Sequence, residues 1–96
     1  MIASFGDKPT ASLFNGDPRK TRKAIHSEIL AVALRKLDML NAASTLSDLN
    51  APPGNRLEPL AGDRHGFHSI RVNTQWRVIF RWQGSDAFDV QVIDYH

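Results

Sequence analysis

The sequence predicts a single α+β domain over residues 1–96, with one or two helices packed on one side of a mainly antiparallel sheet of four to five strands. Two patterns favour this fold class. The part of the chain after Gly54 alternates apolar and polar residues, as strands do, and a long stripe at helical spacing precedes it. Helices placed ahead of an antiparallel run are typical of α+β domains. Ninety-six residues suffice for one modest core.

The N-terminal part predicts two short elements. Met1–Phe5 is apolar and is expected to form a strand that joins the later sheet. Pro9–Phe14 is expected to form a short helix that buries Leu13 and Phe14. A break follows at 15–18, where Asn, Gly, Asp and Pro stand together.

Ile25–Ala43 carries the clearest helical pattern and should pack against the sheet. Its apolar residues recur at spacings of three and four. They are Ile25, Ile29, Ala33, Leu37 and Leu40, widened by Leu30 and Leu34. The polar residues mostly lie off this stripe; they are Glu28, Arg35, Lys36 and Asp38.

The next segment leaves the helical pattern, and Leu46 and Leu49 are expected to enter the core. Residues 51–54, with two prolines and a glycine, end any helix. Asn55–Leu60 is a further strand candidate.

Three C-terminal segments are predicted strands: Phe67–Asn73, Trp76–Trp82 and Phe88–Tyr95. The residues between them, 73–75 and 83–86, have the length and composition of hairpin turns. Uninterrupted alternation places one set of side chains on a common face: Ile70, Val72, Trp76, Val78, Phe80, Trp82, Phe88, Val90 and Val92. The opposite face then presents arginines.

The basic residues are unevenly distributed, although the net charge is only +2. Five of the eight arginines lie between Arg56 and Arg81, where the only acidic residues are Glu58 and Asp63. Arginine binds phosphate bidentately, so this segment fits a phosphate-contacting face. A solubilising sheet face explains the same charge pattern equally well.

Several classes of site and location are disfavoured. The chain has no cysteine and no stretch long enough for a membrane span. Because the N-terminus also lacks the pattern of a signal peptide, a cytoplasmic protein is expected. His65 and His68 form only a weak metal signal without further ligands, and Glu58 and Asp63 have no defined geometry as a carboxylate pair, so neither a metal nor a cofactor is predicted.

A basic run, Arg19–Lys23, follows the break at 15–18. With no hydrophobe to bury, it gains little from ordering, and the segment Gly16–Lys23 is expected to be mobile. The alternative is a helix capped by Asp17 with Pro18 at its first position.

The run GNRLEPLAGDRHGFHSIRVNTQWRVIFRW, together with the terminal DYH, resembles the HigB-type toxins of the RelE/ParE superfamily. The resemblance extends over the whole chain. It implies a RelE-like fold and a type II toxin that cleaves mRNA in the ribosomal A site without a metal. It also implies a helix-turn-helix antitoxin of the HigA type as partner, through which the toxin would reach operator DNA only indirectly.

Cleavage of RNA by its own 2′-hydroxyl needs a base, an acid and cations that stabilise the phosphorane charge. Arg77 alternates with Trp76 and Val78, so it is expected to be exposed, and Arg77→Ala should barely change stability. A surface ion pair with Asp94 is the structural alternative. By resemblance, Arg77 contacts the scissile phosphate, and Asp94, Tyr95 and His96 transfer protons or orient the RNA.

Further RNA contacts are expected from Arg56, Arg64, His68, Arg71 and Gln75, with His68 on the working side of the sheet. One departure from the resemblance concerns the segment 57–62. Many relatives carry a His and a Lys there, where this chain has Glu58 and Ala61. This change should weaken phosphate binding and proton transfer, and with them the potency of the nuclease.

Two other functions compete with this hypothesis. One is a non-enzymatic inhibitor that binds a protein target such as DNA gyrase, as ParE-type toxins do; a pure binder would not need the arginine and DYH cluster. The other is a simple nucleic-acid-binding module, but the chain lacks the stacking aromatics and glycine loops of common RNA-binding folds.

Overall fold

The computed structural model describes residues 1–16 and 29–95. Within these ranges the elements follow the predicted order. They are α1 (Lys8–Asn15), α3 (Leu30–Ala42), η2 (Leu46–Asn50), η3 (Pro53–Asn55), β1 (Glu58–Pro59), η4 (Gly62–Arg64), β2 (Phe67–Arg71), β3 (Trp76–Gln83) and β4 (Asp86–Asp94).

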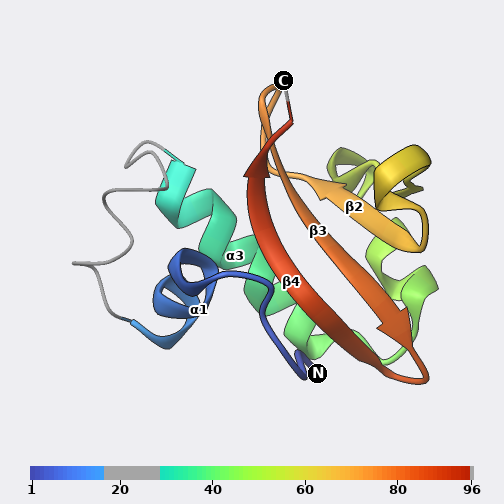
Figure 1. Cartoon of the computed structure of the whole chain (residues 1–96), viewed down its shortest axis with the longest axis horizontal. Coiled ribbons are helices and arrows are strands. Elements are labelled where there is room, and N and C mark those ends of the chain that lie inside the picture. Colours follow the sequence, from blue (N-terminus) through green and yellow to red (C-terminus); the bar gives the residue numbers. More distant parts are fainter. Residues whose placement is uncertain (17–28, 96) are drawn as a thin grey trace.

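The four strands form one sheet in the order β1-β2-β3-β4, and every pair is antiparallel. Both helices lie on the same side of it (Figure 1). The predicted α+β class, with helices on one side of an antiparallel sheet, is confirmed. We call the sheet surface that α1 and α3 cover the inner face and the opposite surface the outer face.

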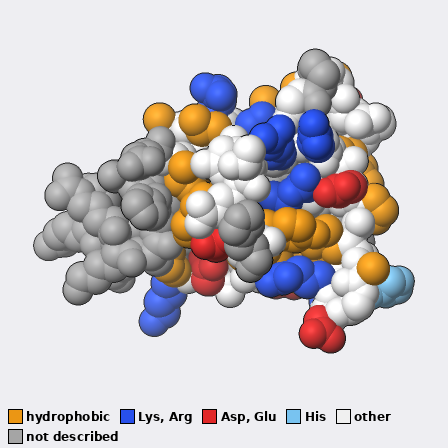
Figure 2. Space-filling view, turned by 90° about the horizontal axis from the view of Figure 1, so that it is seen from above, with side chains coloured by type: hydrophobic (Ala, Val, Ile, Leu, Met, Phe, Trp, Pro, Cys, Tyr) orange, Lys and Arg blue, Asp and Glu red, His pale blue; other side chains and the backbone are white. Residues whose placement is uncertain are grey.

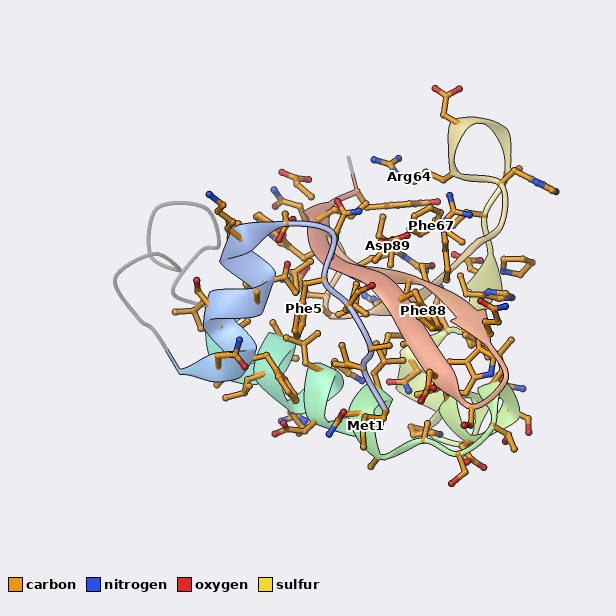
Figure 3. The ribbon with its side chains drawn as sticks, turned by 60° about the horizontal axis from the view of Figure 1, so that its bottom comes forward. Met1, Phe5, Arg64, Phe67, Phe88 and Asp89 are labelled. Carbon is orange, nitrogen blue, oxygen red and sulfur yellow. The ribbon has the colours of Figure 1, made fainter. Side chains whose placement is uncertain are left out.

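The N-terminal segment lies along the free edge of β4, visible in Figures 1 and 3 from Met1 to Phe5. It forms two isolated parallel bridges, Ile2 with Ala87 and Phe5 with Val90. The expected strand therefore joins the sheet edge, but not as a continuous ladder. Between the bridges, the Asp89 amide donates to the Ser4 hydroxyl instead of to a backbone carbonyl (2.9 Å).

Helix α1 is held by its caps and by one buried threonine. Asp7 Oδ1 accepts from the Thr10 amide at the first turn (2.9 Å), and Gly16 ends the helix with a positive φ of 86°. Thr10 is fully buried, and its hydroxyl accepts from the Val92 amide (2.9 Å). Leu13 and Phe14 pack against the core but are only partly buried, so the prediction that they anchor this helix is met in part.

The apolar stripe predicted for helix α3 is buried over the residues that the structure describes, from Ile29 onward. Ile29, Ala33, Leu37 and Leu40 are all buried. The expected start at residue 25 lies outside the described residues, as do the basic run 19–23, Asp17 and Pro18. No helix in the described part of the chain is long and apolar enough to cross a membrane.

Lys36 is the residue of α3 that contradicts the helical pattern. It was expected on the solvated side, but it is only 9% exposed and donates to Asn55 Oδ1. Burial lowers the pKa of Lys36, and the neighbouring Arg35 lowers it further. Asn55 is itself fully buried, and its amide nitrogen donates to the Leu49 carbonyl (3.0 Å), so this polar contact ties α3 to the loop before β1.

The inner face carries the core, which includes Ile70, Val78, Phe80, Val90 and Leu49. Leu46 packs against it, as expected. The prediction that Phe88 shares the face of Val90 and Val92 is wrong. A bulge between Ile79 and Arg81 sets Asp89 and Val90 opposite the single residue Phe80, and Asp89 has a φ of 54°.

The bulge changes which residues of β4 face the helices. Ala87, Val90 and Val92 are buried in the core, whereas Phe88 is the register partner of Arg81 on the outer face. A strict alternation cannot include both Ala87 and Val90 on one face, so one extra residue has to be accommodated between them.

Candidate active site

The outer face presents the arginines that the alternation predicted. Register and alternation place Ser69 and Arg71 of β2 on it, together with Arg77, Ile79 and Arg81 of β3. Figure 2 looks onto the end of the molecule that carries the C-terminus, and Lys and Arg side chains gather there around hydrophobic ones. A basic surface therefore lies beside the last residues of the chain.

Arg77 is the best-connected of these arginines. Its Nη1 donates to Ser69 Oγ and lies 2.8 Å from Glu58 Oε1. Its guanidinium carbon lies 5.2 Å from the centre of the Tyr95 ring, within the range of a cation–π contact. Strands β1, β2 and β3 and the residue after β4 thus all contribute to one cluster, which we call the Arg77 cluster: Glu58, Ser69, Arg71, Arg77 and Tyr95.

The environment of Arg77 corrects two expectations. The side chain is only 11% exposed, not on the open surface. Its carboxylate partner is Glu58 of the edge strand and not Asp94. Burial of a guanidinium is costly unless it is paired, and the ion pair with Glu58 and the hydrogen bond with Ser69 provide that pairing.

Arg71 is the register partner of Arg77, so the two like charges share the outer face. No described carboxylate pairs with Arg71. Because like charges directly opposite each other destabilise a sheet, this pair is suited to an anionic ligand placed between or above them.

The turn between β2 and β3 is joined to the end of β4. Gln75 Nε2 donates to Asp94 Oδ2 (2.8 Å), and the Gln75 carbonyl accepts from the Tyr95 amide (2.7 Å). This fixes the direction of the chain at Tyr95, a residue that is 43% exposed. Asp94 is the register partner of Trp76, so alternation directs its side chain away from the face of Arg77.

The structure gathers some of the predicted residues and separates others. His68 is the register partner of Phe80, and their rings stack 6.1 Å apart, so His68 lies on the inner face and its expected place on the working side is wrong. Arg56 and Arg64 are exposed in the loops around β1, and no described contact joins either to Arg77. His96 lies outside the described residues.

A second outer-face group lies four residues further along β3. The Arg81 guanidinium packs 4.5 Å from the centre of the Phe67 ring, and its Nε lies 3.4 Å from Asp89 Oδ2. Figure 3 shows Phe67 and Arg64 toward one corner of the molecule and Asp89 and Phe88 on β4. This group was not singled out from the sequence, although Phe67 and Arg81 belong to the alternating segments.

The Arg77 cluster has the groups that stabilise a phosphorane. An arginine, a side chain that stays protonated, is mostly shielded from solvent and held in place by two side chains, and a second arginine lies opposite. A phenol stands next to the guanidinium, and a half-exposed carboxylate contacts it. Within the described residues, no group of three or more His, Asp or Glu side chains is placed to hold a metal ion.

Comparison with known proteins identifies relatives across almost the whole chain. Residues 3–96 match the model of the HigB-like toxin family, described as the RelE-like toxin of the type II toxin–antitoxin system HigB. Toxin HigB-1 of Vibrio cholerae is 45% identical over 82 residues, which are 85% of this chain and 84% of that protein. Endoribonuclease HigB of Proteus vulgaris is 36% identical over 96 residues, the full length of both.

Solved structures support the fold. A mutant of YafQ from E. coli superposes with a TM-score of 0.65 at 14% identity, covering 99% of this chain and 94% of that one. The YoeB/ParE toxin from Agrobacterium tumefaciens gives a TM-score of 0.56 at 17% identity, over the full length of both chains. The resemblance seen in the sequence is therefore confirmed: the chain belongs to the HigB-like family of RelE-like toxins of type II toxin–antitoxin systems, and as such it has an antitoxin as partner.

Proposed function

We propose that this toxin is a metal-independent endoribonuclease that cleaves mRNA on the ribosome and so inhibits translation. The observation that carries the proposal is the Arg77 cluster, in which a positioned guanidinium meets a second arginine and a phenol on an open sheet face. The name of the Proteus vulgaris relative, an endoribonuclease identical at 36% of positions over its full length, supports the same activity.

In this proposal Arg77 binds the scissile phosphate and stabilises the charge that develops on it. The two described polar contacts of Arg77, with Ser69 and Glu58, both use Nη1, and a guanidinium has five N–H donors, so other donors remain for phosphate oxygens. Arg71 supplies a second positive charge, and the Tyr95 hydroxyl protonates the leaving 5′-oxygen; the contact of the Tyr95 ring with the Arg77 guanidinium supports this role. Asp94 and Gln75 hold the chain end that carries Tyr95.

The remaining predicted residues act outside the Arg77 cluster. Arg56 and Arg64 are exposed and contact RNA or ribosomal RNA by charge, and His96 follows Tyr95 as a further proton-transfer group. His68 is left out of the RNA-contacting set because it stacks on Phe80. The ribosome positions the mRNA, since a sheet of four strands offers limited surface for holding free RNA.

The partners follow from this function. The antitoxin is a helix-turn-helix protein of the HigA type, and operator DNA is contacted only through the complex with it. The toxin acts on the cytoplasmic ribosome and needs no membrane.

The test is a reconstituted cleavage assay in which mRNA 5′ ends are mapped with and without ribosomes. We expect wild-type protein to cut mRNA on programmed ribosomes, to leave naked mRNA intact, and to lose activity on Arg77→Ala. Arg35→Ala, an exposed arginine on α3, is the matched control. Intact mRNA combined with inhibition of DNA gyrase would instead establish the ParE-like alternative.

A further inference from the structure

We propose that Arg81 and Asp89 form a subsite that selects a guanine base in the mRNA, with Phe67 as its positioning residue. The inference rests on the proposed endonuclease function and adds a specificity determinant to it. The three residues come from β3, β4 and β2 and form the second outer-face group described above, which contains no member of the Arg77 cluster.

Arg81 is held on two sides and still faces solvent. Its guanidinium carbon lies 4.5 Å from the centre of the Phe67 ring, and its Nε lies 3.4 Å from Asp89 Oδ2. Phe67 and Asp89 accordingly lie near each other in Figure 3. The Arg81 side chain is nevertheless 52% exposed. Because the described ion pair uses Nε, the N–H groups of both Nη atoms are available to a ligand.

Asp89 reaches Arg81 because of the bulge in β4. Its φ of 54° lies in the left-handed region, which is uncommon outside glycine, and the bulge sets it beside Val90, opposite Phe80. The Asp89 amide donates to the Ser4 hydroxyl, so the N-terminal segment supplies the partner that the interrupted ladder lacks. Bulges and left-handed residues are concentrated next to active sites, where they direct a side chain. The side chain directed here is a carboxylate that is 50% exposed.

A guanidinium beside a carboxylate matches the base-pairing edge of guanine. A carboxylate only accepts hydrogen bonds, and a guanidinium only donates them. Guanine presents two adjacent donors, the N1–H and the 2-amino group, next to one acceptor, the 6-oxygen. The base-pairing edges of adenine, cytosine and uracil lack two adjacent donors. Asp89 therefore accepts from N1 and the 2-amino group while Arg81 donates to the 6-oxygen, as proteins read unstacked RNA bases.

The subsite lies on the path of an RNA strand bound at Arg77. Arg77 and Arg81 are four residues apart on β3, so both side chains lie on the outer face, about 13 Å apart along the strand. With its scissile phosphate on Arg77, the RNA covers this distance with a nucleotide close to the cut. The base that Arg81 and Asp89 read therefore stands at one fixed position relative to the cleaved bond.

The first experiment changes the RNA and leaves the protein intact. Wild-type toxin is given ribosome-bound mRNAs that are randomised around the cut, and the new 5′ ends are sequenced. We expect guanine to be enriched at one fixed position. Inosine at that position lacks the 2-amino group and should lower the single-turnover rate about tenfold, within the discrimination that a bidentate contact to a base provides.

The second experiment changes the reading residues. Asp89→Asn keeps the size of the side chain and suits a positive φ, but it turns a donor toward the donors of guanine. This variant should cut guanine and inosine sites at one rate, with cleavage at other sites retained. Arg81→Gln and Phe67→Leu should weaken the guanine preference too. Asp38→Asn and Arg35→Gln, matched charge changes on exposed residues of α3, should keep the wild-type preference.

Three results would each overturn the subsite while mRNA is still cut, and so leave the proposed function standing. They are a wild-type toxin without a guanine preference, an inosine site cut as fast as the guanine site, and a preference that survives both Asp89→Asn and Arg81→Gln. An equal loss of rate at every site in Asp89→Asn would also overturn it, by assigning the carboxylate to the fold alone. Ribosome-bound mRNA left intact by wild-type toxin would overturn the proposed function and the subsite together.

Discussion

Arg71 and Arg77 stand directly opposite each other across β2 and β3, two like charges on one face of the sheet. Such a pair destabilises a sheet, and Glu58 offsets the charge only on the side of Arg77. We expect Arg71→Gln to raise the melting temperature slightly while lowering the cleavage rate severalfold. Arg35→Gln on α3 is the control and should change neither. A variant that melts earlier would show that Arg71 stabilises the fold instead.

Arg77→Ala should remove activity and also cost stability. The alternation of the sequence predicts an exposed Arg77 and hence an unchanged melting temperature in this variant. In the structure, however, the side chain is only 11% exposed, is paired with Glu58 and is hydrogen-bonded to Ser69. Losing contacts of this kind costs about 1–3 kcal/mol, and losing a phosphorane contact lowers the rate about a hundredfold or more. Thermal melts beside cleavage assays measure both. An inactive but fully stable variant would contradict the structural part of this prediction.

Tyr95 offers two separable contributions, its ring and its hydroxyl. Tyr95→Phe keeps the ring 5.2 Å from the Arg77 guanidinium but removes the proton donor, whereas Tyr95→Ala removes both. If the hydroxyl protonates the leaving oxygen, the two variants should lose a similar large factor in rate. Near-normal cleavage by Tyr95→Phe would assign Tyr95 to packing on Arg77 alone.

The buried contact between Lys36 and Asn55 should be a main determinant of stability. Asn55→Ala removes the acceptor of a buried ammonium group and the donor to the Leu49 carbonyl. We expect a loss of about 2–4 kcal/mol in urea denaturation, because Lys36 is left buried without its partner. Asn50→Ala, on an exposed residue nearby, should change the unfolding free energy little.

Asp48 should make the stability sensitive to acid. Its carboxylate accepts from the Thr45 and Ser44 amides (3.0 and 2.9 Å), and these hydrogen bonds lower its pKa from 3.8. A lowered pKa in the folded state stabilises the protein above pH 3.8, and this stabilisation is lost as the pH falls through the folded value. The difference in melting temperature between wild type and Asp48→Ala should therefore shrink from pH 7 toward pH 3. An equal difference at both would show that these hydrogen bonds to the carboxylate do not stabilise the fold.

Strands β2 and β3 and helix α3 were predictable because each carries an unbroken local period. The strands at 67–71 and 76–83 and the stripe from Ile29 to Leu40 follow spacings of two and of three to four. The same alternation places His68 with Ile70, so the inner position of His68 was already implied by the pattern. Placing His68 beside the arginines relied on the ability of histidine to transfer protons and overlooked its position in the alternation.

Contacts between distant segments could not be predicted in this way. Lys36 is buried because Asn55 lies across from it, nineteen residues later in the chain, and no local spacing encodes that partner. Glu58 meets Arg77 because the two-residue strand β1 pairs with β2 in one register out of several possible. Periodicity identifies a face of a strand, but register decides which side chains meet there.

The bulge at Asp89 determines how β4 tolerates a change of length. Ala87 lies on the inner face before the bulge, and Val90 and Val92 lie on it afterwards, so the extra residue reverses the alternation for the rest of the strand. Deleting Asp89 would restore regular pairing, with Val90 alone opposite Phe80, and would leave Ile93 opposite Arg77 and Tyr95 on the outer face. Within this family, a single-residue deletion at the bulge is therefore expected to keep Tyr95 beside Arg77 and to spare catalysis wherever the sheet still folds.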